Sequence, residues 1–209
     1  MKLYDFKMAP NPRRARVFLA EKGLEIETVQ IDMMQGEQLS DDYRKVNPRC
    51  TIPSLELDDG TILTENTAIA DYLEALVPEP PLMGRNPVER AMVVEWNAII
   101  ERDGIGSLAD AFRNTNPAFA DRATVGPNNY AQIPELAERG RARAEVFFKA
   151  LDQRLEGREF IATDDFSLAD ITALITVDFS KMARVEVPEE LSHLHAWYGR
   201  VSSRPSAQA

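Results

Sequence analysis

"CTIPSLELDDGTILTENTAIADYL", residues 50–73, contains the pattern that decides the fold. Pro53 stands just before a stretch in which Leu55 and Leu57 alternate with polar residues, which is the pattern of a half-buried strand. Proline lacks a backbone donor and is confined to strand starts, edges and bulges. The Asp-Gly pair at 59–60 is typical of a hairpin turn. The stretch therefore predicts a β-hairpin that begins at a proline.

A helix is predicted directly after this hairpin, opened by the Glu-Asn pair at 65–66. An acidic residue is favourable near the positive end of a helix, and asparagine is a capping residue. The apolar residues that follow recur at helical spacing: Ala68, Ile69, Tyr72, Leu73 and Leu76. A hairpin that runs straight into an amphipathic helix is the central unit of the predicted fold.

Charge and cysteine content exclude several classes of function. The 209 residues carry 34 acidic side chains against 24 lysines and arginines, a formal charge of −10. Such a charge opposes binding to nucleic acid and to anionic membranes, so neither is expected as a partner. The single cysteine, Cys50, excludes an internal disulfide and favours a reducing, cytoplasmic location. We expect no signal peptide and no membrane span, because no apolar run of sufficient length occurs.

The first 77 residues predict a mixed α/β layer. Asn11 is a suitable N-cap, with Pro12 in the first helical position and Gly23 just past the helix end. The other elements expected before the hairpin are strands at 3–8 and 26–32 and a short helix at 40–47. The predicted order is β-α-β-α-β-β-α, in which the first two strands are parallel and the hairpin is antiparallel.

A proline-rich segment at 78–86 predicts a linker, since neither a helix nor a strand can run through it. Beyond it, residues 87–209 show helical periodicity almost throughout and predict an all-helical domain. The stretch 113–130 is the exception, because it is loop-like and of a length that often has a function. Within the helical domain, "FSLADI" at 166–171 has the spacing of a capping box with a hydrophobic staple.

These features in this order resemble a cytosolic glutathione transferase, and the resemblance covers nearly the whole chain. Its most specific parts are "NPRCTIPSLELDDGTILTENTAIADYLEALVPEPPLMG" and "REFIATDDFSLADIT". The resemblance implies an α/β thioredoxin-like N-terminal domain with a mixed four-stranded sheet, and an all-α C-terminal domain. It implies glutathione as co-substrate and a hydrophobic electrophile as acceptor, bound partly by the helical domain.

The resemblance also implies which residues bind glutathione. The peptide bond before Pro53 would be cis and would expose the backbone of Ile52 to the cysteinyl unit of glutathione. Glu65 would bind the γ-glutamyl ammonium, and Asn66 with the first amides of its helix would bind the γ-glutamyl carboxylate. Asn66 departs from the family, which has Ser or Thr here. Thr51 is a further candidate contact.

Thiol activation in this family comes from the first β-α junction, where Asn11 aligns with the serine of serine-type members. Glutathione reacts as a thiolate, and the side-chain amide of Asn11 can donate a hydrogen bond to sulfur. The alternative is that Asn11 only caps its helix, and the two roles are compatible. Tyr4 is a weaker candidate that is expected to pack within its strand. Arg13, Arg14 and Arg49 either raise the local potential or are solvated surface charges.

The remaining reactive residues point away from metal or redox chemistry. Cys50 is expected to be a packed side chain, and His193 and His195 are expected on the surface without a metal. Aromatic residues that could line the acceptor site are Trp96, Phe112, Phe119 and Tyr130.

The resemblance thus implies a homodimeric glutathione S-transferase that serves in detoxification. Two alternatives stay open. One is a glutathione-dependent lyase, dehalogenase, isomerase or peroxidase that uses the same site. The other is a noncatalytic binding module with this fold.

Overall fold

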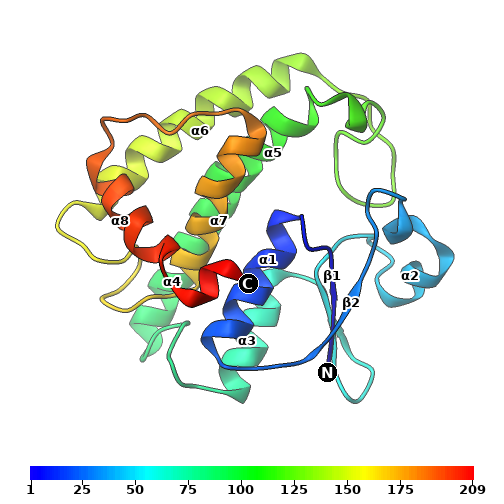
Figure 1. Ribbon diagram of the computed structural model, residues 1–209, viewed down its shortest axis with the longest axis horizontal. Coiled ribbons are helices and arrows are strands. Elements are labelled where there is room, and N and C mark those ends of the chain that lie inside the picture. Colours follow the sequence, from blue (N-terminus) through cyan, green and yellow to red (C-terminus); the bar gives the residue numbers. More distant parts are fainter.

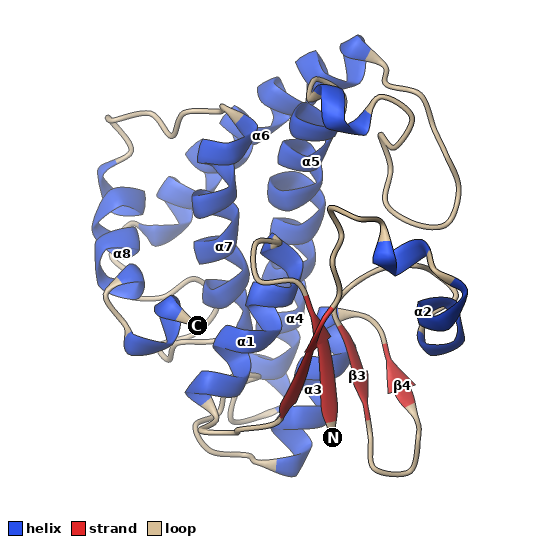
Figure 2. Cartoon of the chain, turned by 45° about the vertical axis from the view of Figure 1, so that its right-hand side comes forward, coloured by secondary structure: helices blue, strands red, loops and turns tan.

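The computed structural model describes residues 1–209, and its N-terminal half is built on one mixed four-stranded sheet (Figure 2). The strand order is β2-β1-β3-β4. The β1 and β2 strands are parallel, whereas β3 is antiparallel to both β1 and β4. The strands are β1 (Lys2–Asp5), β2 (Glu27–Gln30), β3 (Ser54–Glu56) and β4 (Ile62–Leu63). The predicted hairpin and both earlier strands are confirmed, although β1 and β2 are shorter than the sequence pattern suggested.

Helices cover both faces of this sheet. They are α1 (Pro10–Glu21), the short 3-10 turn η1 (Glu37–Leu39), α2 (Asp41–Val46) and α3 (Asn66–Leu76). Leu3 and Leu55 belong to the large hydrophobic core that contains residues of α1 and α3. Tyr4 and Val29 pack instead against a small cluster that includes Tyr43 of α2. The two clusters follow from the alternation of side chains along each strand.

The helical half is arranged around α7, which is buried along most of its length (Figure 1). Its other helices are α4 (Pro87–Ile99), α5 (Gly106–Arg113), α6 (Pro134–Leu155) and α8 (Ser192–Ser202), with α7 at Leu168–Ala183. A π-helical segment, η2 (Ile100–Ile105), joins α4 to α5, and short 3-10 turns occur at η3 (Pro117–Phe119) and η4 (Pro205–Gln208). The predicted all-helical character of this half is confirmed.

The segment between α3 and α4 is fixed by a buried ion pair. Lys22, at the end of α1, lies 2.5 Å from a carboxylate oxygen of Glu74 in α3. The same ammonium donates to the carbonyl oxygens of Pro78 and Pro80. A single continuous core then includes residues of both halves, such as Phe18 and Leu73 from the first and Ile171 from the second.

The predicted capping box at the start of α7 is present. The Asp170 carboxylate accepts hydrogen bonds from the backbone N–H and the hydroxyl of Ser167, from the N–H of Ile161 and from the indole of Trp197. Burial raises the pKa of Asp170 to about 6, although these four donors oppose the shift. Phe166 and Ile171, the predicted staple residues, are both buried.

Among the helices, none combines the length and the apolar character that crossing a bilayer requires.

A glycine allows α5 and α6 to approach closely. An ideal Cβ at Gly140 of α6 would lie 2.5 Å from the carbonyl oxygen of Ser107 and 2.9 Å from the amide nitrogen of Ala111. Real Cβ atoms do not come so near backbone atoms, so a side chain at this position would force the helices apart.

We expect Gly140→Ala to lower the free energy of unfolding by about 1–3 kcal/mol, as overpacking does in a well-packed core. Gly199→Ala in α8 is the matched control, because a Cβ there meets nothing within 4 Å. That control should raise stability by roughly 0.4–1 kcal/mol, since it only reduces the freedom of the unfolded chain. Urea denaturation of the two variants measures both effects. Equal effects of the two substitutions would contradict the close contact at Gly140.

Candidate functional site

The register of the sheet brings the predicted site segments to one edge. Tyr4 near the end of β1 lies opposite Ser54 at the start of β3, and Leu55 of β3 lies opposite Leu63 at the end of β4. The chain therefore leaves β1, enters β3 and leaves β4 at the same edge. The segment after β1 opens α1, and the segment after β4 opens α3.

The segment before β3 is held by its own side chains. The peptide bond between Ile52 and Pro53 is cis, as predicted. The carbonyl oxygen of Thr51 accepts hydrogen bonds from the Tyr43 hydroxyl at 2.7 Å and from the Asn47 side-chain amide at 2.8 Å. By contrast, the backbone N–H and C=O of Ile52 have no hydrogen-bond partner in the chain. The backbone groups of Ile52, which is itself a buried residue, are thus left unpaired.

Cys50, two residues before Ile52, is a packed side chain as predicted. It is buried, and its sulfur lies 3.7 Å from the carbonyl oxygen of Pro48. Its φ of 54° is in the left-handed region, which marks the sharp turn by which the chain enters the site edge.

The start of α3 carries two polar side chains with different surroundings. Glu65 is the N-cap residue, but its side chain makes no capping hydrogen bond. That carboxylate is 63% exposed and lies 3.4 Å from the guanidinium of Arg49. Asn66 is buried, and its Oδ1 has no partner in the chain. The helix start therefore has uncapped N–H groups, an exposed carboxylate and an unsatisfied amide within two residues.

Asn11 is not the N-cap of its helix, so that prediction was wrong. The helix begins one residue earlier, with Pro10 in the first turn and Ala9 as an N-cap that offers no side-chain acceptor. Proline fits this position because its φ is already helical and its missing N–H would be unpaired there anyway. Asn11 is exposed, and its Oδ1 lies 3.5 Å from a guanidinium nitrogen of Arg14.

The first turn of α1 has few backbone donors. Pro10 and Pro12 carry no N–H, so Asn11 supplies the one backbone donor of these three residues. That N–H has no hydrogen-bond partner in the chain, and neither has the side-chain NH₂ of Asn11. Two donor groups, the backbone N–H and the side-chain NH₂ of Asn11, thus stay unpaired at the positive end of α1.

A buried arginine ties the starts of α1 and α3 together. Arg14 lies 2.5 Å from a carboxylate oxygen of Glu101 and donates to the side-chain oxygen of Asn97 at 3.2 Å. Asn97 in turn donates to the hydroxyl of Thr67, in the first turn of α3, at 3.0 Å. Its oxygen also accepts from Thr172 of α7 at 2.6 Å. Burial lowers the pKa of the Arg14 guanidinium, which is opposed by Glu101.

Sequence reasoning left Arg14 as either a surface charge or a source of potential and missed Asn97 altogether. One signal was available, because Arg14 stands three and four residues before Val17 and Phe18 and so shares their buried helix face. A charged residue at such a position implies a buried partner, but the sequence does not say which one.

Tyr4 is engaged elsewhere. Its hydroxyl donates to Glu56 at 2.6 Å, and its ring packs edge-on against Tyr43. Burial and the neighbouring Glu56 carboxylate raise the pKa of Tyr4 to about 12. The predicted packing role of Tyr4 is confirmed.

The loop-like stretch after α5 reaches back to the site edge. Arg113 donates to the carbonyl oxygens of Arg122 and Ala123, and Arg122 donates to the carbonyl oxygen of Gly126 at 2.7 Å. Gly126 is buried, with its Cβ position 3.7 Å from the carbonyl oxygen of Arg49. Burial and the charge of Arg122 lower the pKa of Arg113 to about 10. The loop is therefore held by hydrogen bonds among its own residues, and it lies beside Arg49, the ion-pair partner of Glu65.

The aromatic candidates divide into two groups. Phe112 packs edge-on against both Phe119 and Phe179 at the end of α5, and Tyr130 is about half exposed. Trp96 packs under the guanidinium of Arg154 on α6, which gives it a structural role. His193 and His195 are exposed, as predicted.

Family models match both halves of the chain. The model described as "Glutathione S-transferase, N-terminal domain" matches residues 9–76. The model described as "Glutathione S-transferase, C-terminal domain" matches residues 117–205.

Full-length relatives agree with these matches. Glutathione S-transferase 2 of Saccharomyces cerevisiae is 33% identical over 100% of this chain and 88% of its own length. The crystal structure of a glutathione S-transferase domain-containing protein from Marinobacter aquaeolei superposes with a TM-score of 0.92 at 37% identity, covering 99% of both chains. The β-etherase LigF of a Sphingobium strain superposes with a TM-score of 0.83 at 25% identity, covering 99% of this chain and 96% of its own.

Proposed function

Since the chain belongs to the glutathione S-transferase family, we propose that it binds glutathione at the shared edge of β1, β3 and α3 and transfers it to a hydrophobic electrophile. The observation that carries this proposal is the start of α3. There a buried Asn66 oxygen without a partner stands beside the exposed carboxylate of Glu65, at a helix end with no side-chain cap. This oxygen is an acceptor, and an unpaired buried polar atom costs about 1–3 kcal/mol, so a ligand donor such as an ammonium that pairs with it gains that energy.

The γ-glutamyl end of glutathione fits this helix start. Its carboxylate would accept from the first N–H groups of α3 and from the side chain of Asn66, because anions are favourable at a helix N-terminus. Its ammonium would bind the Glu65 carboxylate, which is exposed and forms an ion pair with the Arg49 guanidinium. The two charges of the ligand thus meet groups of opposite sign within two residues.

The cysteinyl unit would pair with Ile52. The unpartnered N–H and C=O of Ile52 allow an extended peptide to add to this edge as a short extra strand. Pro53 fixes the direction of the chain at this point. Thr51 would contribute only as a donor, through its backbone N–H and its hydroxyl hydrogen, because its carbonyl and hydroxyl oxygens already accept from Asn47.

The thiolate would be stabilised by Asn11, through its backbone N–H or its side-chain NH₂. A hydrogen bond to a charged group contributes about 1.5–3 kcal/mol. The helix terminus adds about 0.3–1 kcal/mol. Together these lower a thiol pKa by about one to three units, at roughly 1.36 kcal/mol per unit. Asn11 would thus make glutathione a nucleophile near neutral pH.

The acceptor would bind between the segment that opens α1 and the loop after α5. Met8 in the first segment is 62% exposed, and Tyr130 in the loop is 52% exposed. Phe112 and Phe119 would support this wall from behind. A mixed aromatic and thioether lining suits an apolar electrophile.

The proposed homodimer would form through α3 and α4. An ion pair between Asp71 and Arg90 joins the two helices on their exposed side. Apolar side chains exposed on the same two helices are Ala68, Ala75, Leu76, Val88, Ala91, Val94 and Ala98. Sedimentation velocity should then show a species of twice the chain mass. We also propose a detoxification role and a cytoplasmic location, and the free, buried thiol of Cys50 suits the reducing conditions of that compartment.

A glutathione-dependent lyase is the second candidate function, favoured by the similarity to the β-etherase LigF. Both reactions use a glutathione thiolate as nucleophile and differ in the leaving group of the acceptor. Product analysis with a panel of aryl halides, epoxides and aryl ethers would separate them.

We expect Glu65→Ala to weaken glutathione binding by roughly 10- to 100-fold, because a lost charged hydrogen bond costs about 1.5–3 kcal/mol. Isothermal titration calorimetry measures the change. Glu25→Ala is the control, since Glu25 is an exposed acid just before β2, at the opposite end of the sheet. Equal affinity of wild type and Glu65→Ala would show that the γ-glutamyl end binds elsewhere.

Asn11→Asp should raise the thiol pKa of bound glutathione and sharply lower kcat, because an ionised carboxylate cannot donate and repels the thiolate. The melting temperature should stay near that of wild type, since a negative charge is favourable in the first turn of a helix. Asn11→Ser should retain part of the activity, because a hydroxyl still donates. Ultraviolet titration of the bound thiolate and a melting curve of each variant test this. An unchanged thiol pKa in Asn11→Asp would remove the side chain of Asn11 from the mechanism.

A further inference from the structure

Residues 204–207 run along α1 and bind both of its ends. At the last residue of α1, the Glu21 carboxylate accepts two hydrogen bonds from Arg204, each 2.8 Å long, and one from the Ser206 hydroxyl. In the first turn, Arg13 donates to the carbonyl oxygen of Ala207 at 2.7 Å. Figure 1 shows the C label beside α1. The helix that begins at Pro10 is therefore held near both of its ends by this segment.

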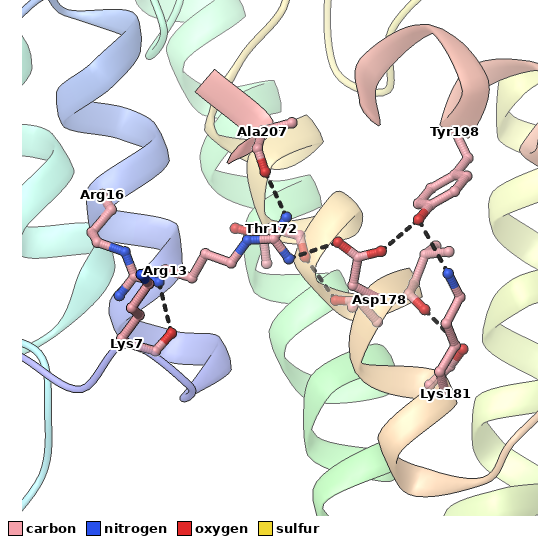
Figure 3. A network of polar contacts seen from close by, with 11 residues as sticks. Lys7, Arg13, Arg16, Thr172, Asp178, Lys181, Tyr198 and Ala207 are labelled. Carbon is pink, nitrogen blue, oxygen red and sulfur yellow. Dashed lines mark hydrogen bonds and ion pairs between the residues drawn. The ribbon is translucent and has the colours of Figure 1, made fainter. Parts of the chain in front are cut away.

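Arg13 also binds α7 through the Asp178 carboxylate, and each oxygen of this carboxylate has a hydrogen-bond partner. One guanidinium nitrogen of Arg13 lies 2.6 Å from Oδ2 of Asp178, and the Tyr198 hydroxyl of α8 donates to the other oxygen at 2.5 Å. Figure 3 shows these contacts together with the Ala207 carbonyl. Both side chains of the ion pair are three-quarters buried, at 25% exposure each. A partly buried pair with further partners is held more firmly than an isolated surface pair.

Arg13 and Arg14, near the start of α1, bind different neighbouring elements. Arg14 is directed to Asn97 and Glu101 of the α4–η2 segment, whereas Arg13 is directed to α7 and the 204–207 segment. The turn has no side-chain cap, and two of its first three residues are prolines without N–H groups. Helix ends without such partners fray. The arginine contacts therefore anchor this turn to its neighbours, although its N–H groups stay uncapped.

We propose that Arg13 is a positioning residue for the glutathione thiol: through Asp178 and the Ala207 carbonyl it fixes the first turn of α1, and with it the donors of Asn11. This inference rests on the proposed role of Asn11. A hydrogen bond weakens steeply when its angle or length departs from the optimum, so a small displacement of this turn reduces the stabilisation of the thiolate. A misplacement of about 1 Å can lower a rate by roughly 100-fold.

Asp178→Asn tests this role against a purely electrostatic one, because the two roles predict opposite changes in the thiol pKa of bound glutathione. If Arg13 acted on the thiolate only through its charge, neutralising Asp178 would raise the local positive potential and lower the thiol pKa. If Arg13 positions the turn, the loosened turn raises the thiol pKa. We expect a rise of about one unit, equivalent to roughly a tenfold weaker thiolate stabilisation.

The kinetic constants give a second readout. We expect kcat to fall by about tenfold, while KM for glutathione changes by less than about twofold, since binding contacts lie on β3 and α3. Asp165→Asn is the matched control, because it breaks another interelement arginine–aspartate pair, Arg85–Asp165 at 2.7 Å, away from α1. That variant should keep the thiol pKa and kcat of wild type.

Arg13→Lys provides an independent variant if Asp178→Asn fails to fold. Lysine keeps the charge but cannot bind Asp178 and Ala207 with the planar fork of arginine. We expect a raised thiol pKa and a lowered kcat. An unchanged or lowered thiol pKa in either variant would overturn the positioning role. If Asn11→Asp raises the thiol pKa while Asp178→Asn does not, the proposed function stands and only this inference fails.

Discussion

The first turn of α1 has no cap of its own, and the geometry of the site depends on how its neighbours hold it. Ala9 offers no side-chain acceptor, and the prolines at 10 and 12 remove two N–H groups. Arg14 anchors the turn to the α4–η2 segment through Asn97 and Glu101, and Arg13 anchors it to α7 through Asp178. The site is thereby built on contacts between the two halves of the chain.

The same contacts connect the two helix ends of the site. Asn97 accepts from Arg14 and donates to Thr67, so a single buried side chain spaces the starts of α1 and α3. Because an amide in such a network can neither shift nor lose a partner without leaving a buried polar group unpaired, the spacing is well determined. By contrast, two sets of polar groups at the site edge have no hydrogen-bond partner in the chain, namely the backbone N–H and C=O of Ile52 and the side-chain oxygen of Asn66. Rigid support beneath unsatisfied groups is the arrangement that a preorganised binding site requires.

The local charge around the site differs from the strongly negative net charge of the molecule. The chain carries a formal charge of −10, yet the site edge has two helix N-termini, and the guanidiniums of Arg14 and Arg49 there balance the carboxylates of Glu101 and Glu65. Local fields of this kind decide which ligand charges are favoured, because the effect of more distant exposed charges is screened by salt. An acidic protein can thus have a site suited to a carboxylate and a thiolate.

The sequence by itself determined the order of the elements, the hairpin at Pro53, the helix that follows it and the capping box at Ser167, because these depend on residues a few positions apart. It also indicated which segments would meet, by resemblance. It misplaced the start of α1, since Pro10 and Pro12 are both plausible first helical residues and only packing selects between them. The pairing of Arg14 with Asn97, and of Arg13 with Asp178, was decided by the tertiary structure. Those partners lie 83 and 165 residues apart in the chain, and no local pattern specifies which buried group will meet an arginine at that separation.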